Sequence, residues 1–93
     1  MKFKRDVAAA ILRDLLTKNT MIEDVSDISH EEFVFHAGML SDAGIIEAAL
    51  LPDFSNFQAQ RITWFGYSRL YEFDEALGKE FDPKNFVRNF QRG

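Results

Sequence analysis

The segment EEFVFHAGMLSDAGIIEAALLPDF, residues 31–54, contains the change from helical to strand-like patterning that decides the fold. Its first half repeats apolar residues three and four positions apart, which predicts a helix over about 30–43. Ser29 and Glu32 have the spacing of a capping box at its start, and Gly44 is a natural C-terminal stop. The arc expected to face the core contains Phe33, His36, Ala37, Leu40 and Ala43.

The second half of this segment begins a predicted β-hairpin. The stretch GIIEAALLPD reads as a strand, DFSN as a turn and FQAQRITW as the returning strand. A hairpin alone is marginally stable in water, so it must pack on the helices that flank it.

A first helix is expected over about 4–18, before this unit. Its apolar residues recur at helical spacing and are Ala8, Ile11, Leu12 and Leu15, with Val7 and Leu16 beside them. Asp6, Arg13, Asp14, Thr17 and Lys18 take the opposite side of the helix. Residues 21–29, MIEDVSDIS, read as an irregular or partly helical connection to the second helix.

Two further helices are expected after the hairpin. Thr63 is a suitable N-cap for a helix over about 64–77, which Gly78 would stop. The residues of this helix expected to face the core are Tyr67, Leu70, Phe73 and Leu77. Asp82 and Pro83 are the pairing expected at the start of a last helix, which would run to about Gln91.

This order of elements predicts a single α+β domain over residues 1–93. The expected arrangement is winged helix-turn-helix-like, with a small helical core, a two-stranded β-hairpin wing and a C-terminal helix. The helix over 30–43 would then occupy the position of a recognition helix.

Three stretches carry a resemblance to a known family: MKFKRDVAAAILRDLL, FVFHAGMLSDAGII and ITWFGYSRL. Together they resemble an uncharacterised winged-helix family of bacteria and their phages, whose members have an ITWEGHEFL-type segment after the wing. The resemblance implies a winged-helix fold and, by loose analogy, a regulatory or nucleic-acid role. Phe65 replaces the family's usual acidic residue and Tyr67 its usual histidine.

Gly38 is a further departure, in the middle of the second helix. Glycine at such a position costs about 1 kcal/mol relative to alanine. It is explained either by close helix packing or tolerance at an exposed position, or by the close approach of a partner's backbone.

The composition is that of an ordinary globular protein, with 46% hydrophobic residues, no cysteine and a net charge of −4. The apolar run near the start is interrupted by Arg13 and Asp14, so it does not read as a signal peptide. We therefore expect a cytoplasmic protein that does not contact a membrane. Residues 19–60 contain no Lys or Arg and eight acidic residues: Glu23, Asp24, Asp27, Glu31, Glu32, Asp42, Glu47 and Asp53.

This acidic block argues against DNA reading by the second helix, because affinity for DNA comes largely from cations on phosphates. The outward arc of that helix offers Glu31, Val34, Phe35, Gly38, Ser41 and Asp42, and none of these is a cation. A DNA-binding regulator remains as an alternative. Its contacts would be the terminal and wing cations Lys2, Lys4, Arg5, Arg61, Lys84, Arg88 and Arg92. The last three recur at helical spacing, and they are also explained as the solvated side of an amphipathic helix.

Protein–protein contact is the function that the pattern favours. The residues that would form an apolar patch are Val34, Phe35, Met39, Phe54 and Phe57. The opposing interpretation is that Phe35 and Met39 are buried against residues 20–29 or the last helix. The patch would serve a homodimer or a protein partner, for example as a phage-encoded inhibitor of a nucleic-acid-handling protein.

Catalysis is not expected. His30 and His36 are six positions apart, which does not place them together on a helix as metal ligands four apart would be. The sequence has no Gly-rich phosphate loop and no nucleophile motif. We expect no cofactor, no metal and no small-molecule substrate.

Overall fold

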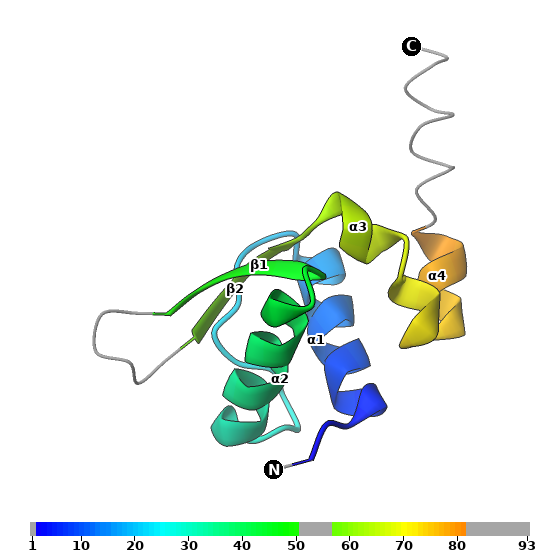
Figure 1. Cartoon of the computed structure of the whole chain (residues 1–93). Coiled ribbons are helices and arrows are strands. Elements are labelled where there is room, and N and C mark those ends of the chain that lie inside the picture. The colour runs from blue at the N-terminus through cyan, green and yellow to red at the C-terminus, as the bar shows by residue number, and fades with distance from the viewer. Residues whose placement is uncertain (1, 51–56, 82–93) are drawn as a thin grey trace.

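The computed structural model describes residues 2–50 and 57–81. Helices α1 (Arg5–Lys18) and α2 (His30–Asp42) lie side by side, and the hairpin of β1 (Ile46–Leu50) and β2 (Phe57–Ile62) lies against them (Figure 1). The chain continues through α3 (Trp64–Tyr67), the 3-10 helix η1 (Leu70–Glu72) and α4 (Glu75–Glu80). The predicted α+β class is therefore confirmed.

Helix α1 agrees with the amphipathic pattern of its sequence. Its buried residues are Val7, Ala8, Ala9, Ile11, Leu12 and Leu15. It ends at Asn19, whose left-handed conformation with φ of 51° lets its amide donate to the carbonyl of Leu15. Asparagine tolerates this conformation better than most residues, so a local signal ends the helix.

Helix α2 has the predicted cap at each end. The Ser29 hydroxyl accepts a hydrogen bond from the Glu32 amide at 3.1 Å, and the Glu32 carboxylate accepts from the Ser29 amide at 3.4 Å. At the C-terminus Gly44 adopts a φ of 78°. The amides of Gly44 and Ile45 then bond back to Ser41 and Leu40, which is a Schellman motif.

One residue of the predicted inward arc of α2 is placed differently. Phe33, His36, Ala37 and Leu40 are buried as expected. Ala43 was expected in the core but is exposed, because the helix ends at Asp42 and Ala43 is its C-cap. The inward arc therefore stops one turn earlier than its spacing indicates.

The hairpin is antiparallel, and its register contains one bulge. Glu47 pairs with Arg61 and Ala48 with Ala59, so Gln60 is the extra residue on β2. On its other side, β2 meets Ile22 at a single bridge, where Ile22 and Ala59 exchange two backbone hydrogen bonds of 2.9 Å. The predicted turn over 53–56 lies outside the described residues.

The prediction of a single helix over 64–77 is wrong, because α3, η1 and α4 divide this region. Thr63 caps α3 as expected, since its hydroxyl accepts from the Gly66 amide at 2.9 Å. The helix then stops, and the Ser68 hydroxyl donates to the Phe65 carbonyl at 2.6 Å. Side chains that bond to the backbone in this way compete with helical hydrogen bonding. A new helix starts at Asp74, whose carboxylate accepts from the Ala76 amide at 2.9 Å.

Gly78 does not stop a helix as predicted but lies inside α4. A side chain at this position would overlap the backbone and Cβ of Tyr71. Its lack of a side chain therefore lets α4 approach η1 closely. The further helix predicted from Asp82 lies outside the described residues.

A single apolar core joins these elements. Its buried members include Ile11 and Leu12 from α1, Phe33 from α2, and Leu70 and Leu77 from the C-terminal half. Tyr67 and Phe73, also predicted to face inward, pack against this core while partly exposed. No helix in the described part of the chain is long and apolar enough to cross a membrane.

Candidate protein-contact surface

The outer face of α2 carries an apolar row. Phe35, Met39 and Ala43 are four positions apart in succession, a spacing that makes each side chain a surface neighbour of the next. Met39 is 45% exposed and Ala43 is also exposed. Met39 is therefore a surface residue, a question that the sequence had left open.

The side chains of Val34 and Phe35 are less exposed to a partner than their outward positions on the predicted helix indicated. Val34 is half-buried and packs against the core. Phe35 is half-buried too, with its ring edge-on to the ring of His36 and the ring centroids 5.1 Å apart. Met39 thus lies on the surface, while Val34 and Phe35 are shared between surface and interior.

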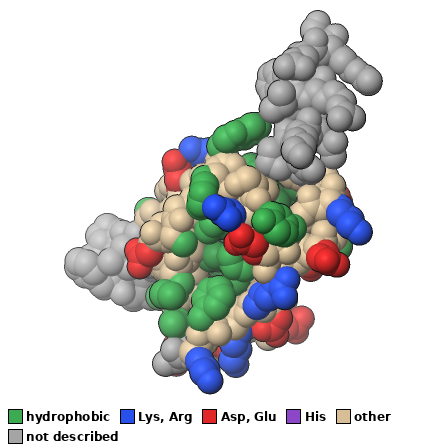
Figure 2. Space-filling model, turned by 45° about the vertical axis from the view of Figure 1, so that its right-hand side comes forward, with side chains coloured by type: hydrophobic (Ala, Val, Ile, Leu, Met, Phe, Trp, Pro, Cys, Tyr) green, Lys and Arg blue, Asp and Glu red, His purple; other side chains and the backbone are tan. Residues whose placement is uncertain are grey.

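The apolar row continues beyond the end of α2. The ring of Phe65, which is 49% exposed, lies about 4.0 Å from the position that a Cβ at Gly44 would occupy. We call Phe35, Met39, Ala43 and Phe65 the outer stripe. Trp64, the residue before Phe65, is 60% exposed. Figure 2 shows that hydrophobic side chains gather in groups on the surface, with charged residues between them.

Two of the three aromatic residues of α3, Trp64 and Phe65, are exposed although the sequence did not predict them as surface residues. The helix predicted over 64–77 directed attention to its inward arc and assigned no role to Trp64 or Phe65. The one signal was the resemblance, in which Phe65 replaces a usual acidic residue, and that resemblance stays a prediction. Contiguous exposed apolar groups mark contact surfaces, so two adjacent exposed aromatic residues extend the candidate surface.

The rim of the outer stripe is acidic. Glu31 and Asp42 are exposed near the two ends of α2, and no Lys or Arg occurs on this helix. Arg69 does approach the stripe, with its guanidinium carbon 4.9 Å from the centre of the Phe65 ring. Its charge is paired with the Glu72 carboxylate at 2.9 Å.

Two other residues predicted for protein contact cannot be placed on this surface. Phe54 lies outside the described residues. Phe57 is the first residue of β2, where it pairs with Leu50, and its side chain lies outside what the structure describes.

Two of the cations predicted to contact nucleic acid are already paired with carboxylates. Arg61 binds Glu47 through two hydrogen bonds of 2.8 Å, an arrangement that raises the pKa of Arg61 and lowers the pKa of Glu47. Lys4 lies 3.3 Å from the Glu32 carboxylate. Lys2 and Arg5 are exposed. Lys84, Arg88 and Arg92 lie outside the described residues.

The two histidines have separate environments. His30 is exposed, and its Nδ1 lies 3.2 Å from the Asp24 carboxylate. His36 is completely buried, as its place on the inward arc predicted, and both of its ring nitrogens have protein partners. Among residues 2–50 and 57–81, no group of three or more His, Asp or Glu side chains could hold a metal ion.

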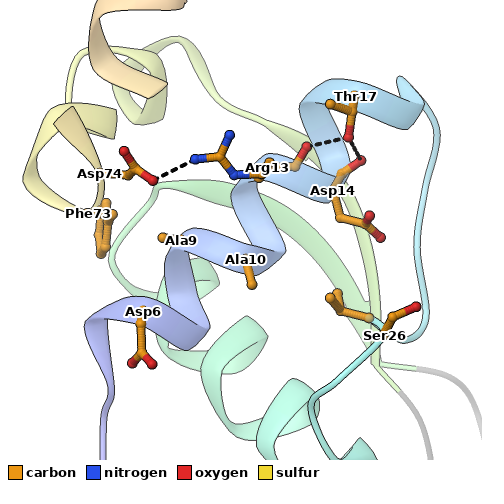
Figure 3. A pocket seen from close by; sticks show the side chains of 10 residues that line it. Asp6, Ala9, Ala10, Arg13, Asp14, Thr17, Ser26, Phe73 and Asp74 are labelled. Atoms are coloured by element: carbon orange, nitrogen blue, oxygen red, sulfur yellow. Dashed lines mark hydrogen bonds and ion pairs between the residues drawn. The ribbon is translucent and has the colours of Figure 1, made fainter. Parts of the chain in front are cut away.

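A groove of about 470 Å³ follows the outer face of α1. In Figure 3, Ala9 and Ala10 lie in the middle, with Phe73 on one side and Ser26 on the other. The sequence pattern put Asp6, Arg13, Asp14 and Thr17 on the polar side of this helix but predicted no groove there. It forms because residues distant in the chain rise on both sides of α1.

The charged groups of this groove are largely paired within the protein. The Arg13 guanidinium lies 2.6 Å from the Asp74 carboxylate, and the Lys18 ammonium lies 3.1 Å from that of Asp14. Burial opposes ionisation of Asp74, but the Ala76 amide and the Arg13 guanidinium outweigh it and lower its pKa. We assign the groove no ligand.

No protein-family model, no curated protein and no solved structure matches this chain. The winged-helix resemblance therefore stays a prediction.

Proposed function

We propose that this chain is a non-enzymatic, winged-helix-like protein that acts by binding another protein through the outer stripe. The observation that carries this proposal is an exposed apolar row that runs from α2 to Phe65 and has no cation on α2. Contact surfaces are rich in aromatic residues and methionine, and Met39, Phe65 and Trp64 are of these types.

The order of elements supports the winged-helix part of the proposal. Helix α1 is followed by the bridge at Ile22, by α2 and then by a hairpin. In a winged-helix arrangement, α2 would correspond to the recognition helix and the hairpin to the wing. In this proposal the surface that usually meets DNA has become a protein-binding surface.

The charges around the stripe favour a partner that is apolar and basic. Glu31 and Asp42 on the rim would attract Lys or Arg side chains that flank an apolar segment. A two-fold contact between two copies would place the same patch against itself and bring these carboxylates together. Like charges that meet in this way weaken association, so we favour a different protein over a homodimer.

The first experiment uses a synthetic amphipathic helical peptide with Leu anchors on one face and Lys on both flanks. The comparison peptide has Glu in place of every Lys. Trp64 is the single tryptophan of the chain and borders the stripe, so its fluorescence reports binding without a label. We expect the Lys peptide to shift its emission to shorter wavelength in a saturable, salt-sensitive way, and the Glu peptide to have little effect.

Two matched variants test whether the stripe is the site. Met39→Asp should weaken peptide binding by at least about tenfold, or about 1.4 kcal/mol. Met21→Asp is the control, because Met21 is similarly exposed at 55% but precedes the bridge at Ile22 and is not part of the stripe. Equal binding of both peptides, or equal effects of the two variants, would contradict the proposal. If the protein forms a dimer and Met39→Asp dissociates it, the partner that binds the outer stripe is a second copy of this chain.

A further inference from the structure

Residues 2–4 form a short extended arm that lies against α2. Lys4 has the backbone angles of a strand, with φ of −121° and ψ of 123°. Its amide donates a hydrogen bond of 2.9 Å to Nε2 of His36. The Phe3 ring lies 5.3 Å from the His36 ring and 6.5 Å from the Phe73 ring, measured between centroids. His36 thus attaches the backbone of the arm to α2, and the Lys4 ammonium adds a second polar contact with the Glu32 carboxylate.

The hydrogen bonds of His36 define its protonation state. Nδ1 lies 2.7 Å from the Glu32 carbonyl oxygen, which can only accept, so Nδ1 must carry a proton. Nε2 faces the Lys4 amide, which can only donate, so Nε2 must carry none. Only neutral imidazole with its proton on Nδ1 satisfies both partners. Because His36 is completely buried, water does not replace either partner.

We propose that His36 is a pH-sensitive latch for this arm. A proton taken from solvent onto Nε2 would remove the acceptor of the Lys4 amide and set two N–H groups against each other. A buried donor left without an acceptor is costly, so the arm would detach and expose the imidazolium to water. Phe3, which is 41% exposed in the closed arm, would leave with it.

The charged groups nearest to His36 work in opposite directions. The Lys4 ammonium, which belongs to the arm, would be repelled by an imidazolium. The Glu32 carboxylate would attract it, but this carboxylate is already bonded to the Ser29 amide and the Lys4 ammonium. Phe73, whose ring lies near that of Phe3, also lines a shallow recess together with Arg5, Asp6 and Glu75. Asp74, next to Phe73, is paired with Arg13.

The latch adjoins the proposed contact surface. Phe35, the first residue of the outer stripe, lies edge-on to the His36 ring. The Phe3 ring of the arm also lies against the His36 ring. Release of the arm would therefore change the apolar surface at one end of the stripe. This consequence rests on the proposed function, whereas the latch itself does not.

The test measures the arm directly and needs no partner. Histidine changes its charge between about pH 5 and pH 8, so nuclear magnetic resonance spectra are recorded across this range. We expect the Lys4 amide signal to move with the same midpoint as the His36 ring signals. After correction for the intrinsic effect of pH, exchange of the Lys4 amide with solvent should become about tenfold faster at the acidic end, which corresponds to about 1.4 kcal/mol.

The two-histidine composition of the chain allows a matched control. His30→Gln removes the exposed histidine and should leave the response of the Lys4 amide unchanged. His36→Gln, whose fold is checked by its remaining amide signals, should abolish that response. If this variant unfolds, the wild-type protein alone provides the test. The latch then requires that the Lys4 amide signal and the His36 ring signals change with the same midpoint. A Lys4 amide that stays protected throughout, or that follows His30 or the carboxylates below about pH 4.5, would refute the latch.

Discussion

Gly66 lies directly against the backbone carbonyl of Ile45, so a methyl group at position 66 would overlap that oxygen. The same methyl group would lie 2.8 Å from the side chain of Ile62. This contact joins α3 to the start of the hairpin. It explains why glycine occurs in a helix, where it is otherwise unfavourable.

Gly66→Ala should destabilise the fold, because the overlap involves backbone that cannot move aside cheaply. We expect a loss of about 2 kcal/mol or more in the free energy of unfolding. Urea denaturation followed by the fluorescence of Trp64 measures it. Gly38→Ala is the matched control, since a Cβ there meets nothing within 4 Å. That change should instead stabilise α2 by up to about 1 kcal/mol. A destabilised Gly38→Ala variant would show that the open space at this position is misjudged.

The different burial of Phe35 and Met39 predicts different effects of serine at the two positions. Met39→Ser should change the free energy of unfolding by no more than about 0.5 kcal/mol, as exposed positions generally do. Phe35→Ser removes a half-buried ring that contacts His36 and should cost about 1–2 kcal/mol. Chemical denaturation of the two single variants tests this difference. Equal costs of the two single changes would contradict the assigned exposures.

The capping box of α2 predicts a pH-dependent contribution from Glu32. The hydrogen bond from the Ser29 amide, helped by the Lys4 ammonium, holds the pKa of Glu32 below its ordinary value of 4.5. A carboxyl whose pKa is lowered by folding stabilises the protein above its unfolded pKa, and this contribution disappears as the pH falls through the lower, folded value.

Glu32→Gln should therefore be less stable than the wild-type protein at about pH 7, and the difference should shrink below about pH 4.5. Thermal unfolding at several pH values measures it. Glutamine keeps an acceptor for the Ser29 amide, so the comparison isolates the charge. Ser29→Ala should cost about 1 kcal/mol at every pH through loss of the cap. A constant Glu32→Gln difference down to about pH 3 would contradict the lowered pKa.

The pairing of Arg61 and Lys4 predicts weak contact with DNA. Titration into fluorescent duplex DNA of mixed sequence at about 50 mM salt should show at most weak binding, because phosphate affinity grows with the number of available cations and two of the described candidates are paired with carboxylates. Glu47→Gln frees Arg61 from its partner and is the informative comparison. Salt-sensitive binding by the wild-type protein would favour the alternative function of a DNA-binding regulator.

The sequence by itself determined the elements whose signals are local. The capping box of Ser29 and Glu32, the left-handed Gly44 and the Thr63 cap are each made by residues a few positions apart, so spacing alone predicts them. The amphipathic patterns of α1 and α2 also sufficed to identify most of the buried face, including His36.

Only the tertiary structure decided the features that depend on distant segments. The predicted helix over 64–77 is divided, and Gly66 in α3 and Gly78 in α4 fit against Ile45 and Tyr71, contacts that no periodicity encodes. Phe65 lies beside Gly44, a residue distant from it in the chain. Nε2 of His36 accepts a hydrogen bond from the amide of Lys4, which lies 32 positions away in the chain. Periodicity reports which side of an element is apolar, but not which other part of the chain will cover it.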